Sequence, residues 1–341
     1  MKRPKWWSVI VVSLALFIAG APCVGDAVQP SPAEIEAALD AAYAKYKGLQ
    51  EGANADYIPA LAEVDPNVWG IALVTTDGKV YTKGDVTTEV SIQSISKVFT
   101  MAKVMEESGP MSIYDNMGVD ATGQVFNAIE PIEMYKGHEM NAMVNAGAIT
   151  ATSMIQGASY DEIWNSILSY YEGFAGRDLK VLEDVYESEA ATNQRNQALA
   201  ELMYAYGRIE DNPERATDIY TRQCSVGVNA KDLAVMAATL ANGGTNPVTG
   251  KVLMQDENVP EVLAVMATAG LYDDAGKWLF KTGLPAKSGV GGGILAVAPG
   301  LFGIAAVSPP LDAAGNSVRA QRAIADIVEA LDANPYHVEP K

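Results

Sequence analysis

The chain has very few of the residues that carry metal, disulfide and catalytic-triad chemistry. Its 341 residues include two histidines, His138 and His337, and two cysteines, Cys23 and Cys224. A structural zinc site, a Ser-His-Asp triad or a disulfide framework is therefore not expected. We expect no metal and no cofactor, and the chemistry has to come from another nucleophile and base.

Positive charge is also scarce. The chain has 24 Lys and Arg against 42 Asp and Glu, which gives a formal net charge of -18. Such an acidic surface repels phosphate backbones, so no nucleic-acid partner is expected. An apolar fraction of 49% and a charged fraction of 19% are typical of a globular chain and exclude intrinsic disorder and a coiled coil.

Long apolar runs are limited to the N-terminus. Lys2, Arg3 and Lys5 precede an apolar run over 6–19 and a small-residue stretch over 20–27, the layout of a secretory signal peptide. The run is shorter than the about 20 residues that a membrane span needs, although an uncleaved anchor is the alternative. We predict a cleavable signal peptide over 1–27 and a periplasmic or secreted protein with no stable membrane association and no internal disulfide.

Strand patterns occur near both ends of the chain. The β-rich runs 69–76 and 80–84 flank Asp77-Gly78, a strong hairpin signal. The runs 294–298 and 302–307 form a similar pair around Pro299-Gly300. The spacing of apolar residues predicts helices over 32–47 and about 317–333. In the middle of the chain it predicts helices over 145–156, 161–174, 191–206 and 230–242. The polar stretch around 211–214 is predicted to be a loop.

Because strands and helices are segregated along the chain, a parallel α/β fold is disfavoured. The pattern predicts an α+β fold: an antiparallel sheet formed from the N- and C-terminal segments with flanking helices, and an inserted all-helical subdomain. We expect one domain over 28–335, with a sheet subdomain of about 31–93 and 275–335 and a helical subdomain of about 95–270. The crevice between the two is the expected site.

Two motifs indicate a serine nucleophile with a lysine base. Ser94 and Lys97 lie at the start of a predicted helix, where this spacing puts hydroxyl and amine on one face within hydrogen-bonding distance. A Ser-x-x-Lys match alone is weak, because roughly one is expected by chance in such a chain. The run Lys287-Ser288-Gly289 precedes the C-terminal strand, as in penicillin-recognising enzymes, which place such a run at a sheet edge opposite their Ser-x-x-Lys.

The pair of motifs suggests a mechanism. Burial and the like charge of Lys287 are expected to lower the pKa of Lys97, so that the neutral amine takes a proton from Ser94. Backbone N–H groups of Ser94 and Val290 would form the oxyanion hole. Glycines beside Val290 are expected to let the substrate approach the backbone closely.

Further blocks carry a resemblance to one family. They are Asp56–Pro59, Gln93–Lys97, Met143–Ile149, Ser188-Glu189 with Asn193, Arg195 and Asn196, Tyr220 with Gln223–Ser225, Gly270–Asp273, and Leu284–Ile294. In this order, over about 31–330, the chain resembles the serine-dependent glutaminases, which have a β-lactamase-like fold. The resemblance implies hydrolysis of L-glutamine to L-glutamate and ammonia through a γ-glutamyl-Ser94 acyl-enzyme, and a homodimer or homotetramer.

The resemblance also implies residue roles. Ser94 matches the nucleophile and Lys97 the general base, with Lys287, Ser288 and Gly289 in support. The substrate-binding positions are Tyr57, Ser94, Asn145, Glu189, Asn196, Tyr220, Tyr272 and Val290. Glu189 suits an α-ammonium, and neutral Asn and Tyr donors suit an α-carboxylate. Tyr272 or Tyr220 could pass the proton that ammonia receives.

Two other functions stay open. A penicillin-interacting serine hydrolase would share Ser94, Lys97 and Lys287, although Glu189 and Asn196 suit a free amino acid better. A non-catalytic exported glutamine-binding protein would keep the pocket without turnover. Without the motif context, Glu189 would be a solvated acid at a helix start. Cys224, with no histidine nearby to activate it, is expected to be a buried small hydrophobic residue.

Overall fold

The computed structural model describes residues 29–338, so the predicted signal peptide over 1–27 lies outside the described residues. Strands from both ends of this part of the chain form one antiparallel sheet in the order β2-β1-β7-β6-β5. The strands are β1 (Gly70–Thr75), β2 (Val80–Gly84), β5 (Ala286–Gly289), β6 (Gly293–Ala298) and β7 (Phe302–Val307). The predicted α+β fold with a sheet built from both ends is confirmed, as are both predicted hairpins.

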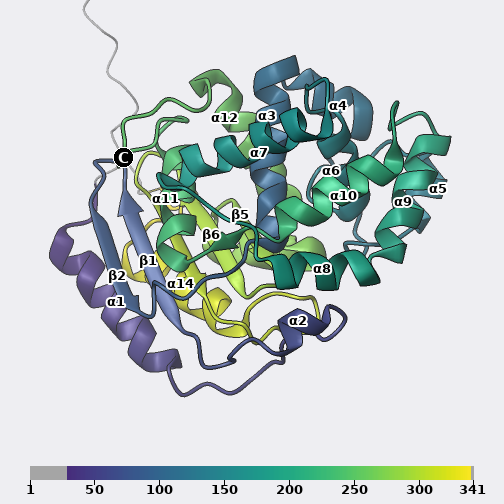
Figure 1. The fold of residues 1–341 in the computed structure, drawn as a ribbon. Helices are drawn as coiled ribbons and strands as arrows, with labels where there is room; N and C mark the ends of the chain where they lie inside the picture. The colour runs from purple at the N-terminus through teal and green to yellow at the C-terminus, as the bar shows by residue number, and fades with distance from the viewer. Residues whose placement is uncertain (1–28, 339–341) are drawn as a thin grey trace, which may run out of the picture.

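Helices cover both faces of the sheet (Figure 1). On one face α1 (Pro32–Tyr46) and α14 (Val318–Ala330) pack their buried residues, such as Leu39 and Ile324, against Ile71 and Ile304. On the other face lies α11 (Ala230–Ala241). A Cβ on Gly303 of β7 would lie 2.1 Å from the backbone N of Ala238. Glycine at 303 therefore allows α11 to lie directly on the strand.

The remaining helices lie mostly beyond α11, on the side away from α1 (Figure 1). They are α2 (Pro59–Ala62), α3 (Ser96–Ser108), α4 (Met111–Met117), α5 (Glu130–Tyr135), α6 (Asn145–Ser153), α7 (Tyr160–Ala175), α8 (Glu183–Thr192), α9 (Gln194–Ala205), α10 (Pro213–Cys224), α12 (Val259–Ala269) and α13 (Ala275–Thr282). The described elements also include three short 3₁₀ helices, η1 (Gln93–Ile95), η2 (Asp256–Asn258) and η3 (Tyr272–Asp274). A separate two-stranded sheet pairs β3 (Val90–Ser91) with β4 (Gly227–Val228).

Three local predictions differ from the structure. The helix predicted over 191–206 begins at Gln194, because Asn193 has non-helical dihedrals and separates α8 from α9. The stretch predicted as a loop around 211–214 contains the start of α10: the Asn212 side chain caps the backbone N of Arg215, and Pro213 occupies the first turn. The helix predicted to reach residue 156 ends at Ser153.

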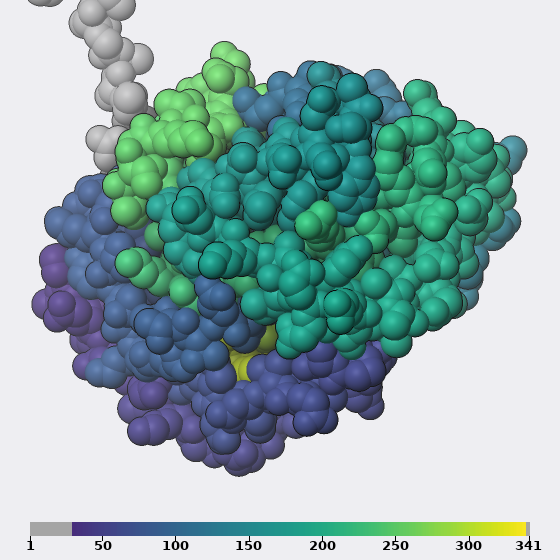
Figure 2. Space-filling model, viewed as in Figure 1, coloured from purple at the N-terminus to yellow at the C-terminus, as the bar shows by residue number. Residues whose placement is uncertain are grey.

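The C-terminal strands lie inside the molecule. All residues of β6 and β7 are buried, and the space-filling view shows little of the yellow C-terminal segment on this face (Figure 2). Among residues 29–338, none of the helices has the length and apolar character of a membrane span.

Candidate active site

The predicted serine and lysine are in direct contact. Ser94 lies in η1, which leads into α3, and the Nζ of Lys97 donates a hydrogen bond to Ser94 Oγ at 2.5 Å. Both side chains are buried, Lys97 with 1% of its surface exposed. Gln93, directly before the serine, has a left-handed φ of 48°, a conformation that costs energy in a non-glycine residue and often marks a functional turn.

Burial changes the charge state of this lysine. Burial lowers the pKa of Lys97 to about 8, although nearby Cys224 and Glu189 oppose the shift. Its Nζ also lies 5.3 Å from the centre of the Tyr220 ring. A substantial fraction of the molecules therefore has a neutral amine beside Ser94 Oγ at slightly alkaline pH, the form that a general base requires.

Lys287 lies on the edge strand β5, as expected. Its Nζ donates to the carbonyl O of Ser288 at 2.8 Å and lies 4.0 Å from the centre of the Tyr272 ring. Burial and the charge of Lys97 hold the pKa of Lys287 well below its ordinary value. Burial, with the charge of Lys97 as the smaller cause, thus favours the neutral form of Lys287, and burial is the leading cause of the lowered pKa of Lys97.

The glycines after Lys287 allow a close approach between two backbone segments. A Cβ on Gly289 would lie 2.7 Å from the carbonyl O of Ile92, and a Cβ on Gly291 would lie 2.2 Å from that of Ser91. These glycines make room for the backbone that leads to Ser94. The close approach brings Val290 and Ser94 to the same pocket.

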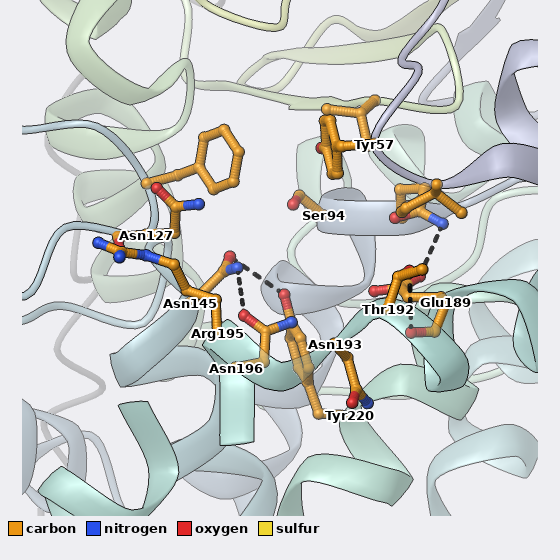
Figure 3. Close-up of a pocket in the computed structure, with 14 residues that line it drawn as sticks. Tyr57, Ser94, Asn127, Asn145, Glu189, Thr192, Asn193, Arg195, Asn196 and Tyr220 are labelled. Atoms are coloured by element: carbon orange, nitrogen blue, oxygen red, sulfur yellow. Dashed lines mark hydrogen bonds between the residues drawn. The ribbon is translucent and has the colours of Figure 1, made fainter. Parts of the chain in front are cut away.

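This pocket opens to solvent, and the space between its side chains, counted together with the open solvent at its mouth, is about 550 Å³. Most predicted substrate-binding residues line it: Tyr57, Ser94, Asn145, Glu189, Asn196, Tyr220 and Val290. Figure 3 shows them around a common space, with Tyr57 across from the Asn145 and Tyr220 side chains. Tyr57 is half exposed, whereas Glu189 and Tyr220 are buried. Lys97, Tyr272, Lys287, Ser288 and Gly289 are not among the lining residues.

Polar side chains in the pocket hold one another in place. Asn145 donates through Nδ2 to Asn196 Oδ1 at 2.9 Å and accepts from the Tyr220 hydroxyl at 3.2 Å (Figure 3). Gln93 Nε2 donates to Glu189 Oε2 at 3.2 Å. Burial raises the pKa of Glu189 to about 7. A bound cation would favour its charged form, so this end of the pocket suits an ammonium group.

Tyr272 lies next to the serine. Its hydroxyl donates to Ser288 O at 3.4 Å. Burial raises its pKa to about 12, while hydrogen bonds with Ser94 and Ser288 lower it. A protonated hydroxyl is thus available as a hydrogen-bond donor beside Ser94.

Some pocket residues were not predicted. They are Ile58, Gln93, Phe126, Asn127, Thr192, Asn193 and Arg195. Phe126 packs on the Tyr272 ring at 5.1 Å between centroids, and its carbonyl O accepts from the backbone N of Asn145 at 2.8 Å. The Asn127 carbonyl accepts from Arg195 Nε at 2.9 Å. Gln93, Asn193 and Arg195 belong to the motif blocks, whereas Phe126 and Asn127 lie in a loop without a recognisable motif.

Cys224 is buried, as expected. Its Sγ lies 3.8 Å from Ser96 Oγ, and burial raises the pKa of the thiol to about 12, so it is an unreactive neutral thiol. Within residues 29–338 no three His, Cys, Asp or Glu side chains are arranged to hold a metal ion.

Comparisons with known proteins agree with this geometry. The family model described as glutaminase matches residues 52–336. A glutaminase of Colwellia psychrerythraea is 54% identical over 310 residues, which cover 91% of this chain and 100% of the relative. A solved structure described as a probable glutaminase superposes with a TM-score of 0.88 at 44% identity, over 90% of this chain and 99% of the other. The structure of Mglu in its glutamate form gives 0.83 at 37% identity, over 88% and 69%. The chain therefore belongs to the glutaminase family and has its β-lactamase-like fold.

Proposed function

We propose that the protein hydrolyses L-glutamine to L-glutamate and ammonia through a γ-glutamyl ester on Ser94. The observation that carries the proposal is the buried hydrogen bond from Lys97 to Ser94, a serine that lines a polar pocket. Family membership supports the substrate, because the relatives at 48–54% identity are named glutaminases.

Acylation begins at the serine hydroxyl. The neutral amine of Lys97 takes the proton of Ser94 as Oγ bonds to the amide carbon of the substrate. The carbonyl electron pair moves onto oxygen, where the backbone N–H groups of Ser94 and Val290 stabilise it. The intermediate then expels the amide nitrogen, which takes a proton through Tyr272 or Tyr220 and leaves as ammonia. Lys97 returns to its neutral form by supplying the proton to that tyrosine.

In deacylation, water is the nucleophile and Ser94 is the leaving group. Lys97 takes a proton from the attacking water, whose oxygen bonds to the acyl carbon, and the proton returns to Ser94 Oγ as the ester bond breaks. Glutamate leaves and the enzyme regains its initial state.

The pocket suits the α-groups of a free amino acid. Glu189 would pair with the α-ammonium, and Asn145, Asn196 and Tyr220 offer neutral donors to the α-carboxylate. The related protein Mglu has a crystal structure in its glutamate form, which agrees with a ligand of this kind. A pocket that binds both α-groups favours glutamine over a peptide or a β-lactam.

The experiment is a coupled glutamate assay with the purified chain. We expect release of glutamate and ammonia from glutamine, and a loss of about a thousandfold or more in kcat for Ser94→Ala and for Lys97→Ala, because the two groups act as a unit. Lys103→Ala, in the same helix but paired with Glu107, is the matched control and should keep its activity. Activity of Ser94→Ala within tenfold of wild type, or hydrolysis of nitrocefin in place of glutamine, would contradict the proposal.

We further propose export and self-association, as the sequence suggests. N-terminal sequencing of the protein from a periplasmic or culture fraction should find a start near residue 28. Sedimentation should find a dimer or tetramer. A full-length chain in the cytoplasm, or a monomer at micromolar concentration, would refute these two proposals.

A further inference from the structure

One serine of the motif blocks lies outside the pocket but contacts a segment that lines it. Ser188 precedes Glu189 on α8 and is not among the pocket residues. Its Oγ accepts a hydrogen bond from the backbone N of Ala60 at 3.1 Å. Ala60 belongs to α2, which lies beside α8 (Figure 1). Ser188 thus joins the helix of Glu189 to the segment that carries Tyr57.

The start of α2 depends on this contact. A helix leaves its first N–H groups without partners inside the helix, and a polar side chain at the N-cap normally binds one of them. In α2 the N-cap residue is Ile58, which makes no side-chain cap, and Pro59 carries no N–H. The Ser188 hydroxyl therefore supplies, from α8, the acceptor that the N-cap of α2 lacks.

Tyr57 lies between two fixed points of the chain. At the first, Ala53 and Leu311 exchange backbone hydrogen bonds of 3.1 and 2.8 Å. The second is the contact of α2 with Ser188. Between them, residues 55–57 make no backbone–backbone hydrogen bond within the described part of the chain. Because Tyr57 is also 51% exposed, packing holds it only in part, and the two fixed points determine where it lies.

Apolar packing extends this arrangement to the proposed oxyanion donor. Ile58, next to Tyr57, belongs to one buried cluster with Val185 of α8 and with Val290. Tyr57, Ile58 and Val290 all line the pocket. A shift of α2 relative to α8 would therefore displace this wall of the pocket.

We propose that Ser188 is a positioning residue that holds Tyr57 at the wall of the substrate pocket. The inference rests on the proposed function, in which glutamine binds between Tyr57 and the Asn145 and Tyr220 side chains across from it (Figure 3). Ser188 acts through α2 and does not touch the substrate. Because Tyr57 would contact glutamine both before and during acylation, losing its position weakens both states alike. The effect is then on KM and not on kcat.

Ser188→Ala removes the acceptor with little change in volume. We expect KM for glutamine to rise about 3–10-fold, the range of one lost hydrogen bond, with kcat within about twofold. Ser188→Thr keeps the hydroxyl and should stay within about twofold of the wild-type KM. Ser159→Ala is the matched control, because Ser159 Oγ caps α7 by accepting from Glu162 N at 3.2 Å and does not line the pocket. This control should keep its KM whatever its stability.

A double-mutant cycle tests whether Ser188 acts through Tyr57. Tyr57→Ala should itself raise KM, and adding Ser188→Ala should then raise KM by less than about twofold. The full effect of Ser188→Ala in the Tyr57→Ala background would overturn the inference. So would an unchanged KM in Ser188→Ala, a loss confined to kcat, or a Ser188→Thr variant as impaired as Ser188→Ala.

Hydrogen exchange gives a readout that does not depend on activity. Peptides that span residues 55–62 should take up deuterium faster in Ser188→Ala than in the wild type, whereas Ser188→Thr should match the wild type. Equal uptake in Ser188→Ala and the wild type would contradict the inference. Failure of the proposed function would appear differently, as a wild-type protein that releases no ammonia from glutamine while the difference in exchange persists.

Discussion

The protonation state of Lys97 leads to a quantitative prediction. Burial moves its pKa from the ordinary 10.5 to about 8. At about 1.4 kcal/mol per pH unit, this is a penalty of roughly 3 kcal/mol on the charged amine. The neutral fraction is then roughly one tenth at pH 7 and nine tenths at pH 9. If the neutral amine is the base, this group alone should raise kcat/KM for glutamine about fivefold from pH 7 to 8, with a plateau above about 9.

Lys287→Met tests the cause of this pKa. If Lys287 is already neutral when Lys97 titrates, its removal should leave the rising limb of the kcat/KM profile in place, within about half a pH unit. If Lys287 were charged, its loss would remove a repulsion, raise the pKa of Lys97 and move the limb to higher pH. The assay is kcat/KM against pH at constant ionic strength. A wild-type rise in kcat/KM with its midpoint near pH 10 would refute the reasoning. So would an upward shift of that midpoint by one pH unit in Lys287→Met.

Three further substitutions follow from the same geometry. Tyr272→Phe keeps the ring contact but removes the hydroxyl near Ser94, so kcat should fall at least tenfold if Tyr272 carries the proton; an unchanged kcat would assign this role elsewhere. Tyr220→Phe should mainly raise KM, measured by initial rates, because its hydroxyl holds Asn145. Gly303→Ala should cost about 1–3 kcal/mol in urea unfolding, since the added Cβ forces α11 away from β7; wild-type stability would contradict that contact.

The parts of the fold that local signals specify could be predicted. Asp77-Gly78 and Pro299-Gly300 mark turns, and strands alternate or run apolar on either side of them. The position of α11 on the sheet depends on contacts distant in sequence and has no such signal. The start of α10 did have a signal in Asn212 and Pro213, and the polar surroundings hid it.

The same distinction holds for the site. Ser94 and Lys97 are one helical turn apart, so their contact follows from spacing alone. Phe126 and Asn127 contribute backbone carbonyls, which any residue type carries, so no pattern of side chains could identify them. The glycines after Lys287 are recognisable in the sequence by their small size, but only the structure shows that the backbone at Ser91 and Ile92 lies against them.

Glu189 and Lys97 together imply that kcat/KM depends more steeply on pH than either group alone would make it. The raised pKa of Glu189 also makes stability depend on pH. Burial raises the pKa of Glu189 from 4.5 to about 7, so the native state keeps a proton that the unfolded state loses between these values. The stability that this group contributes is therefore fully present below about pH 4.5 and is lost as pH rises through 7. Glu189→Gln should remove this loss of folding stability, and it should also raise KM.

In the free enzyme, binding of the α-ammonium needs charged Glu189 and acylation needs neutral Lys97. Because both groups must lose a proton, kcat/KM should fall about a hundredfold per pH unit well below pH 7, and about tenfold in Glu189→Gln. Initial rates at low glutamine between about pH 5 and 7 measure both slopes. Equal slopes in the two proteins would show that Glu189 does not titrate with the substrate's binding, and would move the ammonium to another part of the pocket.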